Sequence, residues 1–562
     1  MKKLAILLSL IPFAIAQESA DPPSRAARLS YINGTVSFQP GGVDDWVPAE
    51  PNRPLTTGDR LWTEEGSRAE LNLGSASFRL NSRTNFTFLN LDDKAAQIQL
   101  SLGTLNVRLR RLAEDETIEI DTPQAAFTLL RPGDYRIEVN EAGDATIATV
   151  RGGDADATAS GQSFPIHARE QVRITGTDGT EPVFDRRPAP PADPFDNFCQ
   201  DRDRREDLST SGKYVSRDMP GYADLDNNGA WRTDPQYGAV WVPSTVPVGW
   251  SPYHYGHWAW IAPWGWTWVD DAPWGYAPFH YGRWAFVAGG WVWVPGPIGP
   301  RPVYAPAMVA FVGGPGFGVA IGGGVAVGWF PLGPREVFVP AYGVSAVYMT
   351  RINVTNTMVT EVAIRNGAVG VVYANRAVPG AVVAVRGEAL VGGRPIAAAA
   401  MRVPPGAIER AEVMQAAPIA PERAAVLGGR APLAGPHLPP AAVVNRPVVA
   451  KMTPPRAPVP FARQQEALRA NPGKPLDAGA VRNLQAGQPA AHPNVRVNAA
   501  PARPNSVEAT PLNNRQNATP AAAPAPKPEP RPEAAPAAKQ EEHAQKKTSK
   551  PAKKTTRSEK DK

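Results

Sequence analysis

Two short connectors contain the residue types best suited to binding a ligand. Each has the order aromatic, histidine, aromatic and directly follows a proline. Their members are Tyr253, His254, Tyr255, Phe279, His280 and Tyr281. Aromatic side chains offer a large rigid surface with a polar tip, and loops carry binding residues more often than the elements they join. We therefore predict that these six side chains are exposed and form the binding surface.

Histidines and carboxylates near the connectors raise a second possibility, a metal or catalytic centre. His254 and His280 occupy equivalent positions, and His257, Asp270 and Asp271 are nearby in the sequence. Such side chains ligate transition metals. Histidines among aromatic residues also use their ring nitrogens to satisfy turns. Asp270 and Asp271 make a poor acid–base pair for glycosidic cleavage, because neighbouring residues of a strand point to opposite faces.

The sequence contains none of the short motifs that mark common hydrolases and zinc sites. It has no His-Glu-x-x-His, no Gly-x-Ser-x-Gly and a single cysteine, Cys199. We expect no enzymatic activity, no catalytic residues, no metal and no cofactor; hydrolysis of an envelope polymer is the alternative. Cys199 is expected to be an incidental thiol on a short helix, with an intermolecular disulfide as the alternative.

The connectors lie within a repeat that holds twelve of the fifteen tryptophans. The pattern Gly-x-Trp followed by Trp-Val begins at Gly229, Gly256 and Gly282, and its Gly-to-Trp intervals are 12, 12 and 11 residues. Within each repeat the aromatics alternate with a period of two, which is the period of a β-strand. The repeat predicts three β-hairpins that share a core. The tryptophans either fill this core or form a platform for a ligand.

The repeat resembles a known family. The blocks GWTWVDDAPWG, APFHYGRW and, further on, WFPLGPREVFVP are similar to exported bacterial proteins with tandem Trp-Gly repeats. That family is known only as a domain of unknown function, so the resemblance implies no activity. Its members often carry a FecR-like domain upstream.

Residues 27–176 read as a first β domain. Their strand-like runs are short and separated by glycine turns, which predicts a β-sandwich or roll. The segments LTTGDRLWTEEGSRAELNLGSASFRL and TPQAAFTLLRPGDYRIEV resemble the FecR domain. That resemblance implies a place outside the cytoplasm and a role in sensing a ligand or partner. We keep a FecR-like sensor in signalling as an alternative function.

The rest of the chain is divided by composition. Residues 1–16 are expected to be a signal peptide cleaved before Gln17, with no transmembrane segment in the mature chain. Residues 177–222 are expected to be a linker with a short, solvated, charged helix, and 223–400 the Trp-Gly repeat β domain with glycine-rich strands. Residues 401–562 are rich in proline, alanine and lysine and poor in aromatics, so we expect them to be disordered.

The charge distribution limits the class of partner. The formal net charge of +6 comes from Lys2, Lys3 and residues 526–562, and the remainder is close to neutral. It lacks the basic stripe that nucleic-acid binding requires. We therefore expect an all-β, non-catalytic protein of the periplasm or cell exterior that binds or scaffolds an envelope protein or glycan.

Overall fold

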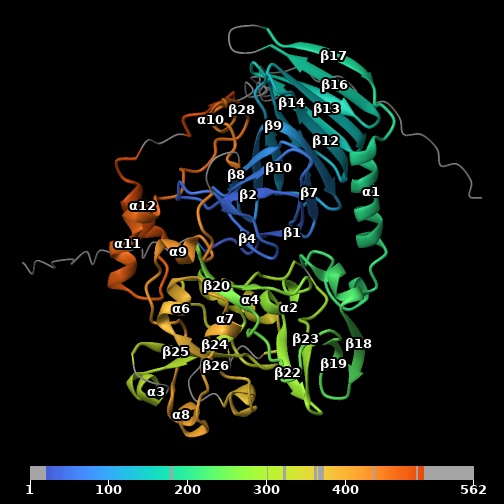
Figure 1. Ribbon diagram of the computed structural model, residues 1–562. Helices are drawn as coiled ribbons and strands as arrows, with labels where there is room; N and C mark the ends of the chain where they lie inside the picture. The colour runs from blue at the N-terminus through green and yellow to red at the C-terminus, as the bar shows by residue number, and fades with distance from the viewer. Residues whose placement is uncertain are drawn as a thin grey trace, which may run out of the picture. The chain divides into compact units, whose positions relative to one another are not determined.

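The computed structural model describes residues 21–176, 181–299, 301–320, 324–359, 364, 372–433, 437–488 and 492–498. The chain divides into a unit of residues 1–501 and a second unit of residues 502–562, and every described residue belongs to the first. The expected signal peptide, residues 1–16, lies outside the described residues. Strands dominate the described part, so the prediction of a β-rich chain is confirmed (Figure 1).

The N-terminal β module, residues 27–188, contains seventeen strands that pair into one network. They are β1 Ala27–Asn33, β2 Val36–Gln39, β3 Val47–Pro48, β4 Pro54–Leu55, β5 Arg60–Thr63, β6 Arg68–Asn72, β7 Ala76–Leu80, β8 Asn85–Leu91, β9 Ala95–Leu109, β10 Thr117–Asp121, β11 Ala126–Leu129, β12 Gly133–Val139, β13 Ala145–Gly152, β14 Asp154–Ala159, β15 Gln162–His167, β16 Glu170–Thr175 and β17 Val183–Pro188. The long strand β9 joins two groups of strands. Its first half pairs with β8 and β10, and its second half pairs with β7 and β12.

Buried phenylalanines pack inside this module. Phe78 of β7 and Phe86 and Phe88 of β8 are fully buried. The rings of Phe86 and Phe88 meet edge to face, with their centroids 4.8 Å apart. The alternating apolar residues of the short strands therefore supply a core, as the sequence pattern predicts.

The charged helix α1, Pro194–Asp207, begins where the sequence supplies an N-terminal cap. Asp193 and Asp196 form a capping box around Pro194. The expectation of a solvated helix is wrong for one face, because Asp203 and Glu206 are buried against the N-terminal β module. Cys199 is also buried, and burial raises the pKa of its thiol to about 12, so an intermolecular disulfide is not available to it. The short helices η1 Ser211–Lys213 and η2 Tyr222–Asn227 follow.

The three predicted hairpins are present. They are β18 Gly229–Asp234 with β19 Gly238–Pro243, β20 Gly256–Ile261 with β21 Gly265–Asp270, and β22 Arg283–Val287 with β23 Gly290–Val294. The first and third join into one sheet of order β18-β19-β23-β22, whereas the second forms a sheet of its own. Across the four-stranded sheet the paired residues are Trp231, Trp241, Trp293 and Trp284. This ladder places one tryptophan of each strand on the same face.

The repeat spacing has a steric reason. In each hairpin the glycine at the start of the first strand, or directly before it for Gly282, lies against the indole of the second strand's tryptophan. A Cβ atom would lie 2.4 Å from Trp241 at Gly229, 2.7 Å from Trp268 at Gly256 and 2.5 Å from Trp293 at Gly282. Only glycine leaves this space, so the Gly-to-Trp interval records a contact between paired strands.

The glycine-rich region after the hairpins completes the tryptophan module, residues 229–414. Its sheet has the order β26-β25-β24-β27. The elements are β24 Val309–Gly313, β25 Ala326–Pro331, β26 Val383–Arg386 and β27 Glu412–Met414, with α2 Ala277–His280, α3 Pro315–Ala320, α4 Ala346–Val354, η3 Ala374–Ala377, α6 Gly387–Val391, α7 Ile396–Ala399 and α8 Pro405–Arg410. Strands β24 and β25 are buried throughout. None of the helices in the described part combines the length and apolarity needed to cross a bilayer.

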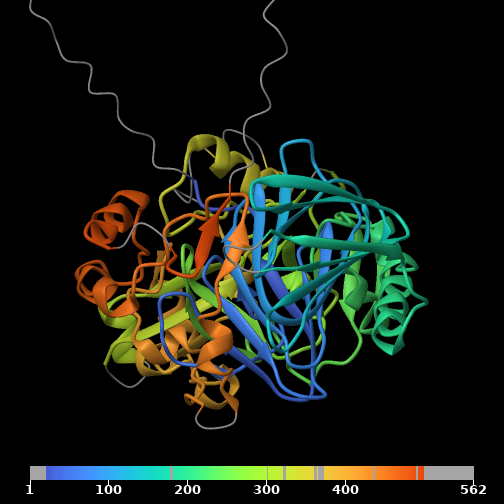
Figure 2. The ribbon, with the colours of Figure 1, turned by 90° about the horizontal axis from the view of Figure 1, so that it is seen from above.

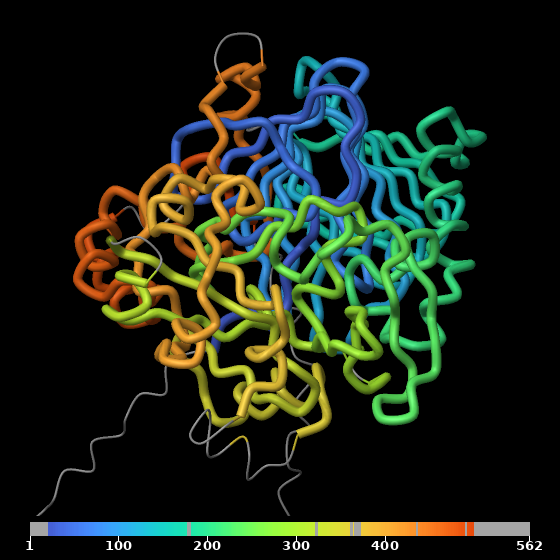
Figure 3. The backbone as a smooth tube through the Cα atoms, turned by 60° about the horizontal axis from the view of Figure 1, so that its bottom comes forward, coloured from blue at the N-terminus to red at the C-terminus, as the bar shows by residue number. Residues whose placement is uncertain are grey.

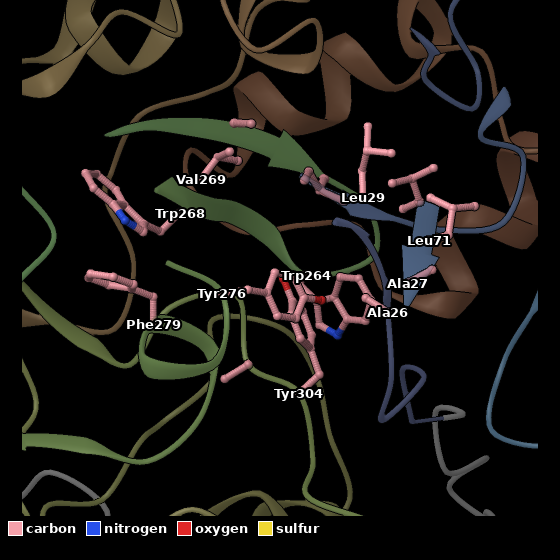
Figure 4. Close-up of a cluster of buried hydrophobic side chains, with 14 of the residues drawn as sticks. Ala26, Ala27, Leu29, Leu71, Trp264, Trp268, Val269, Tyr276, Phe279 and Tyr304 are labelled. Carbon is pink, nitrogen blue, oxygen red and sulfur yellow. The ribbon is translucent and has the colours of Figure 1, made fainter. Parts of the chain in front are cut away.

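The two modules share one hydrophobic core. Figure 4 shows the meeting point, with Ala26, Ala27, Leu29 and Leu71 on one side and Trp264, Tyr276 and Tyr304 on the other. Polar contacts join the same surfaces. Asn52 donates to the carbonyl oxygens of Asp270 at 2.9 Å and Ala272 at 2.7 Å. The boundary between the modules in sequence is therefore not a boundary in packing.

The expected disorder from residue 401 is wrong as far as residue 498. A C-terminal strap, residues 423–498, contains α9 Arg423–Val426, α10 Ala441–Val444, β28 Val448–Ala450, α11 Phe461–Ala470, α12 Ala478–Gln485 and β29 Val495–Val497. It runs beside the N-terminal β module in orange and red (Figures 2 and 3). Leu433, Val449 and Phe461 donate backbone hydrogen bonds to Trp46, Thr122 and Gly42. Residues 499–562 lie outside the described residues.

The strap owes its order to a surface that composition does not reveal. Val443 packs with Trp46, Trp62 and Leu102, a small apolar cluster separate from the main core. A proline-rich chain without a core of its own can still be held by a neighbour's apolar surface and backbone groups.

Brief trypsin digestion should leave a resistant fragment that includes the strap. Lys451 should be protected, because its backbone amide donates to the Glu119 carboxyl at 2.9 Å. Intact-mass analysis of the fragments checks this. Val443→Asp should speed cleavage after Lys451, whereas early cleavage there in the unaltered protein would contradict the packing.

Candidate ligand-binding cavity

The connectors predicted as a binding surface are largely inside the protein. Tyr253, Phe279, His280 and Tyr281 are buried, so the expected exposure is wrong for them. The structure brings the two connectors together, and the Tyr253 hydroxyl donates to the Phe279 carbonyl oxygen at 2.8 Å. The same hydroxyl accepts a hydrogen bond from the Met308 amide at 3.0 Å. The glycine-rich region, which supplies Met308, therefore covers the connectors.

His254 and Tyr255 are the members that keep some exposure. Both are half-buried, and their rings stack with centroids 5.0 Å apart. Their role in binding stays a prediction.

The histidines and carboxylates do not converge into a centre. His280 lies within hydrogen-bond distance, 2.8 Å, of the Ala305 carbonyl oxygen, and burial lowers the pKa of its imidazole to about 3. Asp270 is buried and accepts hydrogen bonds from the Trp268 indole at 2.9 Å and the Ala272 amide at 3.0 Å. Burial raises the pKa of Asp270 well above its usual range, whereas the Asp271 side chain is exposed. Within the described ranges, no group of three or more His, Cys, Asp or Glu side chains could hold a metal ion.

The fully buried tryptophans of the repeat are core and not a ligand platform. Trp241, Trp258, Trp268, Trp284 and Trp293 are fully buried. Several indole N–H groups donate to carbonyl oxygens inside the protein, including Trp241 to Leu225, Trp284 to Pro278 and Trp293 to Tyr281. At these three positions the buried indole is stable because its single donor has a partner.

A cavity of about 360 Å³ lies where three distant segments meet. The N-terminal β module contributes the turn around Thr56 and Asp59, the tryptophan module contributes the turn of the β20–β21 hairpin, and the strap contributes α11 and α12. Figure 1 shows α11 and α12 beside these two modules. Pockets of about 300–1,000 Å³ are typical of small-ligand sites.

The cavity wall is mostly apolar. Its large side chains are Trp260, Trp264, Phe461, Leu468, Leu476 and Val481. Phe461, Gln464 and Leu468 lie three and four residues apart, so they occupy one face of α11 and turn it towards the cavity. The sequence did not predict this face, because the composition of residues 401–562 predicts disorder.

The charged residues of the wall are held by the protein. Arg25 pairs with Glu116 and donates to the Asp92 carbonyl oxygen at 2.6 Å. Arg53 donates to the Val426 carbonyl oxygen at 2.7 Å, and its guanidinium lies 4.7 Å from the Phe38 ring centroid. Arg25 ties the segment before β1 to Asp92, after β8, and to Glu116. Arg53 ties the turn before β4 to α9 of the strap, so both cations shape the cavity.

Asp59 is a residue of the cavity wall whose pKa departs from its usual value. Its carboxyl accepts hydrogen bonds from the Gly41 amide at 2.8 Å and the Thr56 amide at 2.7 Å. Burial outweighs these hydrogen bonds and raises its pKa to about 6. The carboxyl is therefore protonated in the folded protein at a pH where it is ionised in the unfolded chain.

This shift predicts a pH-dependent contribution to stability. Because the pKa of Asp59 is higher in the folded protein than in the unfolded chain, its carboxyl stabilises the fold. This contribution to the free energy of unfolding is complete below the unfolded pKa of about 3.8 and is lost as the pH rises through about 6. Asp59→Asn should remove a decline of up to about 3 kcal/mol between pH 4 and pH 7. Urea unfolding of both proteins at four pH values checks this, with the exposed Asp201→Asn as control. Equal pH profiles for Asp59→Asn and the unaltered protein would contradict the assignment.

Comparisons with known proteins give matches for parts of the chain. No curated protein matches the sequence. Two crystal structures described as a candidate anti-sigma factor from Parabacteroides distasonis ATCC 8503 match at 12% and 13% identity, each with a TM-score of 0.21. Each match covers 23% of this chain and 59% of the other, and the score is too low to show a common fold. The FecR resemblance of residues 27–176 stays a prediction.

The tryptophan hairpins give the family match. Residues 222–336 run from η2 through all three hairpins to β25. This segment matches the model of DUF6600, described as a family of unknown function.

Proposed function

We propose that this chain is an exported, non-catalytic protein of the cell envelope that binds a ligand in the cavity. Export is inferred from Lys2 and Lys3, the apolar run after them and Ala-Ile-Ala before Gln17. A place in the periplasm or outside the cell follows from such a signal. The resemblance of residues 27–176 to FecR domains supports the same location.

One observation carries the binding role. The cavity is assembled from the N-terminal β module, the tryptophan module and the strap, and its wall combines apolar side chains with a few fixed polar groups. This composition is typical of small-ligand sites. The largely buried connectors offer no comparable surface. We therefore place the ligand site in the cavity and not at the connectors.

The hydrolase alternative has less support. Asp270 is buried with its oxygens engaged by Trp268 and Ala272, and Asp271 is exposed. A general acid and base acting on one bond have to face the same substrate. These two carboxyls lie in different environments.

A FecR-like sensor is the second candidate. The specific feature in its favour is that the N-terminal β module supplies part of the cavity wall, through residues such as Thr57 and Asp59. A ligand there would contact the module that resembles FecR and could alter how it meets a partner.

Native mass spectrometry of the mature protein, purified from the envelope fraction, tests the binding role. The expected result is a bound small molecule that is lost in Val481→Trp, where the indole fills the cavity. The matched control is Val497→Trp on β29, a partly exposed position outside the cavity. Absence of any bound molecule, together with no stabilisation of the protein by envelope extracts, would overturn the proposal.

A further inference from the structure

We infer that the cavity binds the acyl chain of an amphipathic anion, with the chain between the β20–β21 turn and α11, and the anionic head beside Arg456. The inference rests on the proposed binding function and names its ligand class.

The polar groups of the wall argue against a glycan. A sugar needs many free hydrogen-bond donors and acceptors. Here the Asp59 carboxyl accepts hydrogen bonds from the backbone amides of Gly41 and Thr56, and the Asn90 side-chain amide donates to the Asp92 carboxyl at 3.0 Å. Four buried wall groups keep no hydrogen-bond partner among the described residues: Arg25 Nη2, Arg53 Nε, Arg53 Nη1 and Trp264 Nε1. All four are donors and offer no acceptor for the hydroxyl protons of a sugar. Since burying polar ligand groups without partners is unfavourable, such a wall selects against a sugar.

The Gln464 side chain is engaged in the same way. It donates to the Val459 carbonyl oxygen at 2.7 Å. The face of α11 that carries it therefore offers the cavity mainly Phe461 and Leu468.

The apolar wall suits a flexible chain. Trp260 and Trp264 lie on one side, and Leu468 and Val481 belong to the two strap helices. A volume of about 360 Å³ corresponds to about a dozen water-sized groups at about 30 Å³ each. A chain of about twelve carbons is of this order.

The charges favour an anionic head. Arg25 and Arg53 are buried and held by Glu116, by Glu50 and by carbonyl oxygens. Arg456 also lines the cavity, but its side chain is exposed and donates only to the Gln485 carbonyl oxygen, at 3.1 Å, among the described residues. An exposed guanidinium at the edge of an apolar cavity can pair with a carboxylate or phosphate head.

Isothermal titration calorimetry with the mature full-length protein tests the inference. The probes are dodecanoate, dodecan-1-ol and octanoate as free monomers. We expect one dodecanoate per chain and weaker binding of octanoate by about 250-fold, since the two differ by about four methylenes and each contributes about fourfold. Val481→Trp should abolish binding, and Val497→Trp should leave it unchanged.

The head group has its own variants. Arg456→Ala should weaken the binding of dodecanoate by about threefold and leave the binding of dodecan-1-ol unchanged. Arg463→Ala, on α11 outside the cavity wall, is the matched control. A lysophosphatidylglycerol monomer distinguishes the source of the chain: tighter binding than dodecanoate assigns a lipid, and weaker binding assigns a free fatty acid.

The outcomes separate the two proposals. Equal binding of dodecanoate and dodecan-1-ol, with no effect of Arg456→Ala, would overturn the anionic head. A bound molecule of another class, with no binding of either twelve-carbon probe, would overturn the acyl chain but leave the binding function. No ligand of any kind would overturn both.

Discussion

Replacing Trp268 with alanine should lower the free energy of unfolding by about 3–5 kcal/mol. The indole is fully buried, and its ring centroid lies 5.5 Å from that of Trp258 and 5.7 Å from that of Tyr253. Truncation leaves a large cavity between these rings. It also removes the indole donor to the Asp270 carboxyl, which is itself buried.

The matched control for this change is Trp231→Ala, at the end of the four-stranded sheet. Trp231 is half-buried, although it belongs to the same repeat and stacks on Tyr214 at 4.5 Å. Its loss should cost about 1–2 kcal/mol. Urea unfolding followed by circular dichroism measures both. Similar small losses would mean that the tryptophan face does not act as core.

Arg79→Met should destabilise the protein by about 3–5 kcal/mol, because it breaks a buried ion network. Arg79 is fully buried and donates to Glu70 at 2.7 Å and to Asp203 of α1 at 2.8 Å. Arg202 donates to Glu70 from the same helix at 2.8 Å. The variant leaves Asp203 buried with its remaining cation, Arg110, at 3.5 Å. Figure 1 shows α1 beside the N-terminal β module, to which this network joins it.

The network also predicts a pH dependence. Burial by itself would raise the pKa of Glu70, but the hydrogen bond from Arg202 and the charge of Arg79 hold it well below its usual range. Such a group contributes stability above its unfolded pKa of about 4.5, and the contribution is lost as the pH falls. The unaltered protein should therefore lose stability more steeply below pH 4.5 than Arg79→Met.

An exposed pair on the same helix is the control for this second change. Arg204 and Asp201 are about two-thirds exposed, so Arg204→Met should cost less than about 1 kcal/mol. Urea unfolding at pH 7 and pH 4 gives both comparisons. If Arg79→Met costs no more than Arg204→Met, the buried network does not stabilise the fold.

The sequence by itself determined the hairpins, because their signals are local. Each glycine lies at or directly before the start of a hairpin's first strand, and its tryptophan lies on the second strand about a dozen residues later. The contact between Gly256 and Trp268 is made within one hairpin. The alternation of aromatic residues fixes which side chains share a face. The same local reasoning predicted the many short strands of the N-terminal β module.

Only the tertiary structure decided what is exposed. The connectors have the composition of surface loops, but Tyr253 is covered by Met308 and by Trp329, whose indole donates to the Tyr253 carbonyl oxygen at 3.0 Å. These partners lie more than fifty residues away in the sequence, so no local sequence pattern could predict the contacts.

The strap and the cavity depend on contacts that are still more distant. Phe461 donates its backbone N–H to Gly42, and Val443 completes a cluster with Trp46 and Trp62. A proline- and alanine-rich segment lacks the apolar surface to fold alone, so its composition predicted disorder. The N-terminal β module supplies the missing apolar surface and hydrogen-bond partners, and the cavity exists only where that module, the tryptophan module and the strap come together.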